Sequence, residues 1–376
     1  MDLDLPASVV AFRDEVREWL AANVPARPLP PMDTPDGFAR HREWEHRLAD
    51  ARLSAVTWPR EYGGRGSSLL EWLVFEETYY ASGAPGRVSQ NGIALLGSTL
   101  LALGTPEQRQ RIVPRMARAD DIWAQAWSEP EAGSDLAAVR SRAVRTDGGW
   151  LLSGQKTWSS RAAFADRAFG LFRSDPGAER HRGLTYLMFD LRAAGVTVRP
   201  IPQLDGTPGF AEIFLDEVFV PDADVLGEPG EGWRVAMSTA SNERGLTLRS
   251  PGRFTAAAGR LVGLWREQPD PAQRDRVVDA WIGAQAYRLH TFGTVSRLAE
   301  GASLGAESSV TKLFWSELDI ALHETALDLL GVAGELDGEW LGGYLFALAG
   351  PIYAGTNEIQ RDVVAERLLG LPRGDR

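Results

Sequence analysis

Two short segments near the middle of the chain hold the side chains best suited to chemistry. They are residues 128–135 (SEPEAGSD) and residues 154–160 (GQKTWSS). Hydroxyl groups at strand ends can donate hydrogen bonds to the edge of a flat ring such as a flavin, and a Trp can cover its face. Taken singly, each segment is more often a serine-rich turn or a core tryptophan. The alternatives are therefore a site for a planar redox cofactor and a purely structural role.

Other catalytic chemistries find less support in the residues. The chain has no Cys, which excludes a disulfide framework, a thiol nucleophile and a thiolate-bound metal or cluster. It also has no G-x-G-x-x-G dinucleotide fingerprint and no P-loop. Of the five His residues only His41 and His46 are close in sequence, and no H-E-x-x-H pattern accompanies them. Surface or packing roles are favoured for these histidines over a metal site.

Charge and composition exclude some classes of partner. The chain has 376 residues, with 40 Lys and Arg against 51 Asp and Glu, a formal net charge of -11. This balance argues against a long contact with a nucleic-acid backbone. The uncharged stretches 88–106 and 340–357 are interrupted by Gly, Pro and polar residues, so no membrane span is expected. The amino terminus lacks the basic start and apolar core of a signal peptide, which favours a cytoplasmic location.

The elements that must position the two segments follow the order helical, β-rich, helical. In the first part, Val9, Phe12 and Val16 recur at helical spacing, and Thr105-Pro106 predicts a helix start. Between about 121 and 225, short β-branched and aromatic runs follow turn residues such as 147–149 (DGG). Helical periods return beyond residue 232.

The second helical part contains one long predicted helix. Its apolar stripe consists of Val310, Leu313, Phe314, Leu318, Ala321 and Leu322. Gly331 is the predicted helix stop.

Several motifs in the right order give the chain a resemblance to the acyl-CoA dehydrogenase family over essentially its whole length. The matching segments are 62–64 (YGG), 104–108 (GTPEQ), 128–135 (SEPEAGSD), 156–160 (KTWSS), 218–221 (VFVP) and 352–361 (IYAGTNEIQR). Residues 308–318 (SSVTKLFWSEL) look most like bacterial members that work as paired subunits on steroid-derived acyl chains.

The resemblance implies an α+β multidomain fold. We expect an N-terminal α-helical domain at 1–120, a middle β-barrel domain at 121–230 and a C-terminal four-helix bundle domain at 231–376. FAD would lie between the middle and last domains and at a subunit interface.

The resemblance also assigns roles to single residues. Those expected to contact FAD are Trp127, Ser128, Trp158, Ser160, Thr356 and Glu358. Ser134 would lie near the pantetheine or phosphate end of the substrate, and Arg244 in the region of the acyl pocket.

The chain departs from the family pattern at two places that usually hold the FAD diphosphate. Where many members have Arg-x-x-Phe-Gly, this chain has residues 265–269 (WREQP), so only Arg266 is retained as a cofactor contact. An Arg common shortly before the Ile-Tyr-x-Gly-Thr segment is replaced by Leu348. A partner subunit or different contacts would then hold the diphosphate.

The catalytic base is expected at an unusual one of two family positions. Many members have the catalytic Glu directly after Tyr in the Ile-Tyr-x-Gly-Thr segment, but that residue is Ala354 here. Other members place the Glu before an Arg on an earlier helix, and this chain has Glu243 followed by Arg244 there. An ion-paired surface Glu is the alternative, which the methyl group at position 354 disfavours. By resemblance the backbone N–H of Ala354 still polarises the thioester carbonyl.

The predicted function is an FAD-dependent acyl-CoA dehydrogenase that forms an α,β double bond in an acyl-CoA thioester. The base takes the α-proton, and the hydride passes from the β-carbon to flavin N5. Two alternatives remain: a flavin-dependent oxidase or hydroxylase on the same fold, and a partner subunit of a heteromeric dehydrogenase. Electron-transferring flavoprotein is the expected acceptor, and the assembly is expected to be a homo-oligomer or a heterotetramer with a second dehydrogenase-like subunit.

Overall fold

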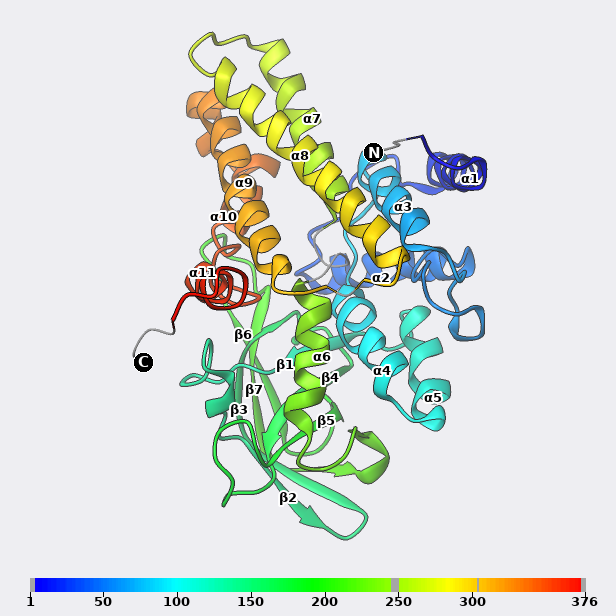
Figure 1. Cartoon of the computed structure of the whole chain (residues 1–376), viewed down its shortest axis with the longest axis vertical. Helices are drawn as coiled ribbons and strands as arrows, with labels where there is room; N and C mark the ends of the chain where they lie inside the picture. The colour runs from blue at the N-terminus through cyan, green and yellow to red at the C-terminus, as the bar shows by residue number, and fades with distance from the viewer. Residues whose placement is uncertain (1–3, 245–249, 303, 373–376) are drawn as a thin grey trace. The chain divides into compact units, whose positions relative to one another are not determined.

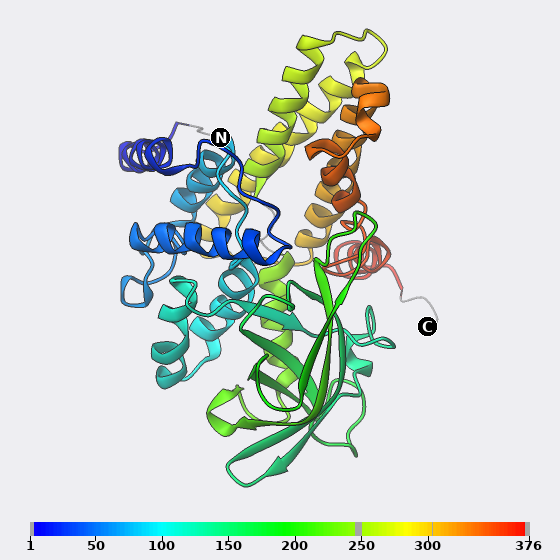
Figure 2. The same cartoon turned by 180° about the vertical axis from the view of Figure 1, so that it is seen from behind.

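The computed structural model describes residues 4–244, 250–302 and 304–372, and for residues 241–244 it describes the helix but not the side chains. Contacts divide the chain into two units. The helical unit comprises Met1–Ala26, Ser68–Ala84 and Arg244–Arg376, and the β unit comprises Arg27–Ser67 and Pro85–Glu243. Along the chain the elements run helical, β-rich, helical, as predicted (Figures 1 and 2).

The helical unit is built on long amphipathic helices. Its elements are α1 (Ala7–Asn23), α3 (Leu69–Ala81), α7 (Pro251–Glu267), α8 (Arg274–Ala299), α9 (Glu307–Leu330), α10 (Glu339–Ala347) and α11 (Asn357–Val363), with a 3-10 turn at Gly331–Glu335 and a π turn at Val364–Leu368. Helices α7, α8 and α9 lie side by side (Figure 1). Their shared core contains Phe254, Tyr287, Trp315 and Leu322. No helix in the described ranges is long and apolar enough to span a membrane.

The predicted apolar stripe of α9 is only half correct. Leu318 and Leu322 are buried, but Val310 and Phe314 are 46% and 42% exposed. The buried face instead includes polar side chains, among them Asp319. The end of the helix was predicted correctly, since α9 stops at Gly331, whose φ of 55° suits glycine.

The β unit carries its own helices beside the sheet. They are α2 (Pro35–Asp50), α4 (Ser98–Leu103), α5 (Pro106–Ala117) and α6 (Gly232–Arg244), with a π turn at Asn91–Gly97 and 3-10 turns at Arg60–Tyr62, Leu136–Ala138 and Asp222–Asp224. Thr105 caps α5 as predicted: its hydroxyl accepts from Gln108 N, and the Gln108 side chain accepts from Thr105 N.

The sheet has eight strands and is mostly antiparallel. They are β1 (Trp123–Ala126), β2 (Arg142–Thr146), β3 (Gly149–Ser160), β4 (Arg167–Arg173), β5 (Leu184–Asp190), β6 (Val196–Ile201), β7 (Phe210–Pro221) and β8 (Val225–Leu226). Their order is β6-β7-β3-β2-β4-β5-β8, with β1 parallel to β4. The β2–β3 hairpin turns at Asp147-Gly148, where the φ of 69° at Gly148 requires a residue that tolerates the left-handed region.

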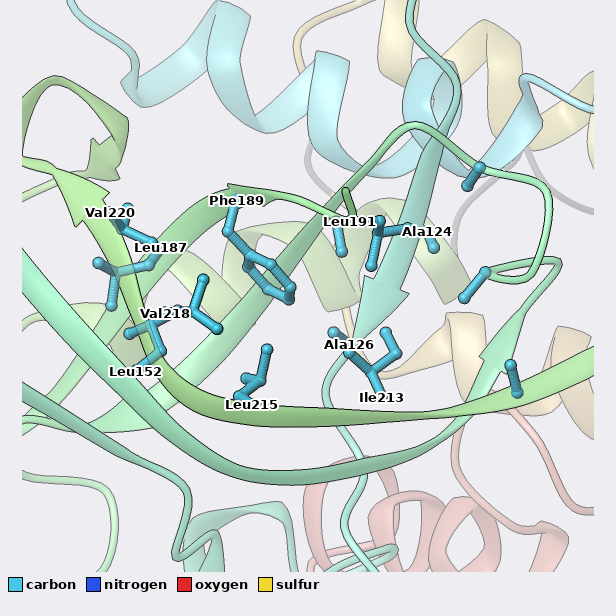
Figure 3. Close-up of a cluster of buried hydrophobic side chains, with 14 of the residues drawn as sticks. Ala124, Ala126, Leu152, Leu187, Phe189, Leu191, Ile213, Leu215, Val218 and Val220 are labelled. Atoms are coloured by element: carbon cyan, nitrogen blue, oxygen red, sulfur yellow. The ribbon is translucent and has the colours of Figure 1, made fainter. Parts of the chain in front are cut away.

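The core of the β unit lies inside the curl of this sheet. Figure 3 shows Leu152, Leu187, Phe189, Ile213 and other apolar side chains pointing toward one another from several strands. Along β7 they alternate with less buried residues, because successive side chains of a strand point to opposite faces, whereas β4 and β5 are buried on both faces. The core therefore fixes the register between β3 and β7. The last residue of β3, Ser160, and the first residue of β7, Phe210, pair near the candidate site.

Helix α6 is fixed against the sheet and α4 within the same unit. The Thr239 hydroxyl on α6 lies 2.9 Å from the Thr99 hydroxyl on α4 and 3.3 Å from the Tyr186 hydroxyl on β5. At its start, a Cβ on Gly232 would come within 2.8 Å of Thr185 backbone atoms, so only glycine allows this approach. The backbone course of α6 up to its last turn is thus determined by the β unit.

Candidate active site

The two segments singled out in the sequence lie side by side in the β unit. Thr157 N donates a hydrogen bond of 2.9 Å to Ser128 O. Next to it, Lys156 Nζ donates to Trp127 O at 3.4 Å. Residues 127–128 and 156–160 are therefore adjacent, and we call these two segments together the β-unit wall. Four of the predicted cofactor contacts lie on it, namely Trp127, Ser128, Trp158 and Ser160.

Trp158 projects from this wall through an unusual backbone. Its φ is 58°, and its side chain is 59% exposed although Trp is a large apolar residue. A non-glycine residue in the left-handed region costs about 1–2 kcal/mol. The strand pairing of β3 with β7 shifts register between Lys156 and Ser159, so Trp158 sits in a bulge. Its ring meets the Phe210 ring edge-on at 6.0 Å.

Lys156 of the wall forms a buried ion pair with Glu129. Lys156 is fully buried, and its ammonium group donates to Glu129 Oε1 at 2.8 Å and to Leu171 O at 2.7 Å. The Glu129 carboxylate also accepts from the backbone N–H groups of Arg140 (2.6 Å) and Ser141 (2.9 Å).

The ionisation of this pair follows from its surroundings. Burial lowers the pKa of Lys156 to about 8, against the opposing effect of Glu129. Burial alone would raise the pKa of Glu129, but the Lys156 cation and the hydrogen bonds from residues 140 and 141 outweigh it and lower that pKa. At neutral pH the pair is therefore predominantly charged on both sides.

In the helical unit, the segment that carries Ala354 has a strained, tightly bonded backbone. Ala354 has a φ of 57°, and Gly355 follows with 82°. The Gln360 side-chain amide donates to both of their carbonyls at 3.2 Å. Thr356 caps the N-terminus of α11, where its hydroxyl accepts from Ile359 N at 3.3 Å. Side chains from the following helix therefore hold this loop in place.

Buried polar groups of α9 hold the other side of the same loop. Asn357 Oδ1 accepts from Lys312 Nζ at 2.7 Å and from Ser316 Oγ at 3.2 Å. Asn357, Lys312 and Ser316 are all at most 4% exposed. A fully buried amide bonded to an ammonium group leaves little freedom to the backbone that carries it.

Aromatic and ionic contacts also surround Tyr353, the residue before Ala354. Its ring stacks on Trp315 at 6.0 Å and lies 6.2 Å from the Phe346 ring. Arg253 pairs with the buried Asp319 at 2.7 Å. Burial works to lower the pKa of Arg253, but Asp319 and the Tyr353 phenol outweigh it and raise that pKa.

The φ of Ala354 gives a direct prediction of stability. Replacing Ala354 by Gly should raise the free energy of unfolding by about 1 kcal/mol, because glycine has no Cβ penalty in the left-handed region. Denaturant unfolding of the two proteins measures the difference. The control is Ala333→Gly in the 3-10 turn, an exposed position with ordinary φ, which should destabilise instead. An equal loss of unfolding free energy in the two variants would show that Ala354 is not strained.

The remaining predicted residues differ in how far the structure places them at a site. Ser134 lies in an exposed loop, and Glu358 is exposed at the start of α11. Hydrogen bonds from the backbone N–H of Glu358 and from the Thr356 hydroxyl lower the pKa of the Glu358 carboxyl group. Arg266 is exposed near the end of α7, and within the described ranges no hydrogen bond joins it to residues 352–360.

Glu243 and Arg244 are the last two residues of α6. Their side chains lie outside the described part of the structure, so their predicted roles remain predictions.

The residues present fit a polar, planar cofactor such as FAD. Among the described residues, the buried side-chain polar atoms without a hydrogen-bond partner include Trp127 Nε1, Ser159 Oγ and Gln360 Oε1. Two of them belong to or adjoin the β-unit wall, and the third lies beside the Ala354 loop. Buried groups without partners are rare and call for a ligand or water. The exposed Trp158 indole adds a flat apolar surface to the β-unit wall.

Sequence reasoning assigned no role to the residues that hold these segments in place. Glu129 and Lys156 stand in the quoted motifs, but nothing in their spacing shows that they pair. A detectable signal was Lys156 itself, since a Lys between inward residues of a predicted strand is unusual unless it is paired. Gln360 and Asn357 lie in the matching segment 352–361, but no structural role was predicted for either residue.

Comparison with known proteins identifies the family to which the chain belongs. The N-terminal, middle and C-terminal domains of acyl-CoA dehydrogenase match residues 7–120, 124–218 and 230–369.

Among curated proteins, acyl-CoA dehydrogenase IpdE1 of Mycobacterium tuberculosis is 42% identical, covering 97% of this chain and 98% of its own. Among solved structures, the Tcur3481-Tcur3483 steroid ACAD superposes with a TM-score of 0.88 at 27% identity over the whole of both chains. The ChsE4-ChsE5 complex of Mycobacterium tuberculosis superposes with a TM-score of 0.84 at 26% identity, again over both whole chains. The chain therefore belongs to the acyl-CoA dehydrogenase family and is an FAD-dependent oxidoreductase that introduces an α,β double bond into an acyl-CoA thioester.

Proposed function

We propose that this dehydrogenase acts on the CoA thioester of a bulky, steroid-derived acyl chain and uses Glu243 as its base. The observation that carries the proposal is the substitution at the usual base position, where Ala354 offers only a methyl group. The likeness to a structure described as a steroid ACAD supports the substrate class.

The site residues take the following roles in this proposal. Trp127, Ser128, Trp158 and Ser160 bind the flavin ring, Thr356 and Glu358 contact the cofactor from the helical unit, and Arg266 is the remaining candidate for its diphosphate. Ser134 lies near the pantetheine or phosphate end of the substrate, and Arg244 near the acyl chain. FAD, when bound, accepts the hydride from the β-carbon.

Two groups of the chain itself act on the thioester. Glu243 removes the α-proton as a carboxylate. The backbone N–H of Ala354 donates to the thioester oxygen and stabilises the negative charge that develops there. The network around Gln360 and Asn357 supports this role, because a donor stabilises a transition state only if it is held in place.

A panel of substrates tests the proposal. The holoenzyme is mixed anaerobically with short, branched, long and steroid-type acyl-CoAs, and loss of flavin absorbance is followed. Steroid-type thioesters should bleach the flavin fastest. Faster bleaching by straight-chain thioesters would contradict the substrate class. Rapid oxygen consumption, with poor reduction of an electron-transferring flavoprotein, would favour the oxidase or hydroxylase alternative instead.

We further propose that the chain assembles with a second subunit, either another copy or a related dehydrogenase chain. Exposed apolar residues on α8 and α9 support this: Val278, Trp281, Ile282, Val310 and Phe314 are each at least 42% exposed. Clusters of exposed apolar side chains commonly mark protein interfaces. The proposal also places the domain boundaries at 120/121 and 230/231. It assigns the protein to the cytoplasm, with an electron-transferring flavoprotein as the electron acceptor.

The assembly gives a second testable expectation. Ile282→Lys should lower the mass of the purified assembly and reduce FAD per chain severalfold, because a charge would then enter the apolar interface. Light scattering with flavin absorbance measures both quantities. Glu18→Lys, an exposed charged position on α1 and so on a different helix from the proposed face, is the control and should change neither. An unchanged mass and flavin content for Ile282→Lys would rule out this face as the interface.

A further inference from the structure

The side chains of Lys156 and Glu129 join four backbone segments, at residues 127–129, 140–141, 156 and 171. Through their side chains they bond the carbonyls of Trp127 and Leu171 and the N–H groups of Arg140 and Ser141. We infer that this buried pair is a positioning device for the flavin: it holds the two halves of the β-unit wall together and keeps Trp158 in its projecting conformation.

The cost of burial argues against a role in stability alone. Lys156 is 0% and Glu129 7% exposed, and taking two charges out of water costs several kcal/mol per ion, of order what their attraction returns. Well-packed apolar residues often stabilise a fold equally well or better. They could not, however, bond two carbonyls and two amide N–H groups at fixed distances. What the ion pair supplies beyond packing is geometry.

The geometry reaches the flavin-binding residues directly. Lys156 is two residues before Trp158, and Glu129 directly follows Ser128. The bulge that presents Trp158 begins at Lys156, where the pairing of β3 with β7 is interrupted. A strained conformation such as φ 58° persists only where the surroundings over-determine it. The Lys156 bonds, together with the Thr157 to Ser128 hydrogen bond, provide that determination on one side of the bulge.

The inference rests on the proposed assignment of Trp158 to the flavin, and the test separates the two. The probe is the holoenzyme, with the FAD dissociation constant measured by flavin fluorescence on dilution. Lys156→Met should raise that constant about 10–100-fold, the effect expected when hydrogen bonds to a charged group are lost. The control is Asp224→Asn, which removes the charge of another buried carboxylate, one that pairs with the more exposed Arg111 and Arg167 away from the wall. It should reduce thermal stability with little change in FAD binding.

A double-mutant cycle with Trp158→Leu supplies a readout that a general loss of stability would not move. If the pair acts through Trp158, the two substitutions affect FAD binding by less than the sum of their separate effects. Lys156→Met should also speed amide exchange at Thr157, whose N–H bonds Ser128 O.

Additive effects of the Lys156 and Trp158 substitutions on FAD binding would overturn the inference. So would equal FAD dissociation constants for Lys156→Met and Asp224→Asn. If Lys156→Met does not fold, Glu129→Gln, which keeps the shape and one carbonyl acceptor, replaces it in the same cycle with the same criteria. If Trp158→Leu alone leaves FAD binding unchanged, the flavin assignment fails, and this inference fails with it.

Discussion

The Glu243→Gln enzyme should reduce its flavin about 10²–10⁴-fold more slowly than the parent when mixed with a good acyl-CoA substrate, the range usual for loss of a general base. A glutamine keeps the size and polarity of the side chain but cannot accept the α-proton. FAD content and acyl-CoA binding should stay close to those of the parent, because the substitution removes only a proton acceptor. Anaerobic stopped-flow absorbance measures the rate.

The control for this variant is Glu231→Gln, directly before the same helix. Glu231 is exposed and pairs with Arg234, so its substitution should leave the rate of flavin reduction unchanged. Parental rates in Glu243→Gln would move the base to another residue or to a partner chain. A comparable slowing in both variants would instead point to a disturbance of helix α6 (Gly232–Arg244).

Local signals in the sequence predicted much of the fold correctly. The order of helical and β-rich parts, the cap at Thr105, the turn at Gly148 and the stop at Gly331 were all confirmed. Each of these depends on neighbours a few residues apart: a hydroxyl near an amide N–H, or a glycine where φ is positive. Such contacts can be read without knowing the tertiary structure.

Contacts between distant segments could not be predicted in this way. Lys156 and Glu129 meet because β3 passes beside the loop after β1, and no spacing in the sequence encodes that approach. The α9 face was misjudged for a related reason. Asp319 is buried because Arg253 of another helix neutralises it, while Phe314 is left partly exposed, so hydrophobicity alone identified only part of the buried face.

The motifs named the residues of the candidate site but did not show how they are held. Ser128 and Trp158 were named from the resemblance, whereas the bulge and the positive φ at Trp158 are visible only in the folded strand pair. Strain of this kind depends on hydrogen bonds to the partner strand and the adjoining loop. It concentrates at functional sites, where local rules of sequence are most often broken.

The second large effect is expected from returning a carboxylate to the position that holds Ala354. In the Glu243→Gln background, Ala354→Glu should speed flavin reduction by at least about tenfold over Glu243→Gln alone, since restoring part of a general base recovers part of its contribution. The backbone can accept this change. Ala354 already has a Cβ at a φ of 57°, so a longer side chain adds no new penalty of that kind.

The matched control for the added carboxylate is Ala354→Gln in the same background. It has the same length and shape and lacks only the ability to accept a proton, so any difference between the two double variants measures base catalysis. The Gln360 and Asn357 bonds hold the loop through the carbonyls of residues 354 and 355 and through a buried amide, none of which the substitution removes. Equal rates for the Glu and Gln variants would show that a carboxylate at position 354 cannot reach the α-proton in this enzyme. In that case Ala354 contributes only its backbone N–H, and the departure from the usual base position reflects a different placement of the substrate.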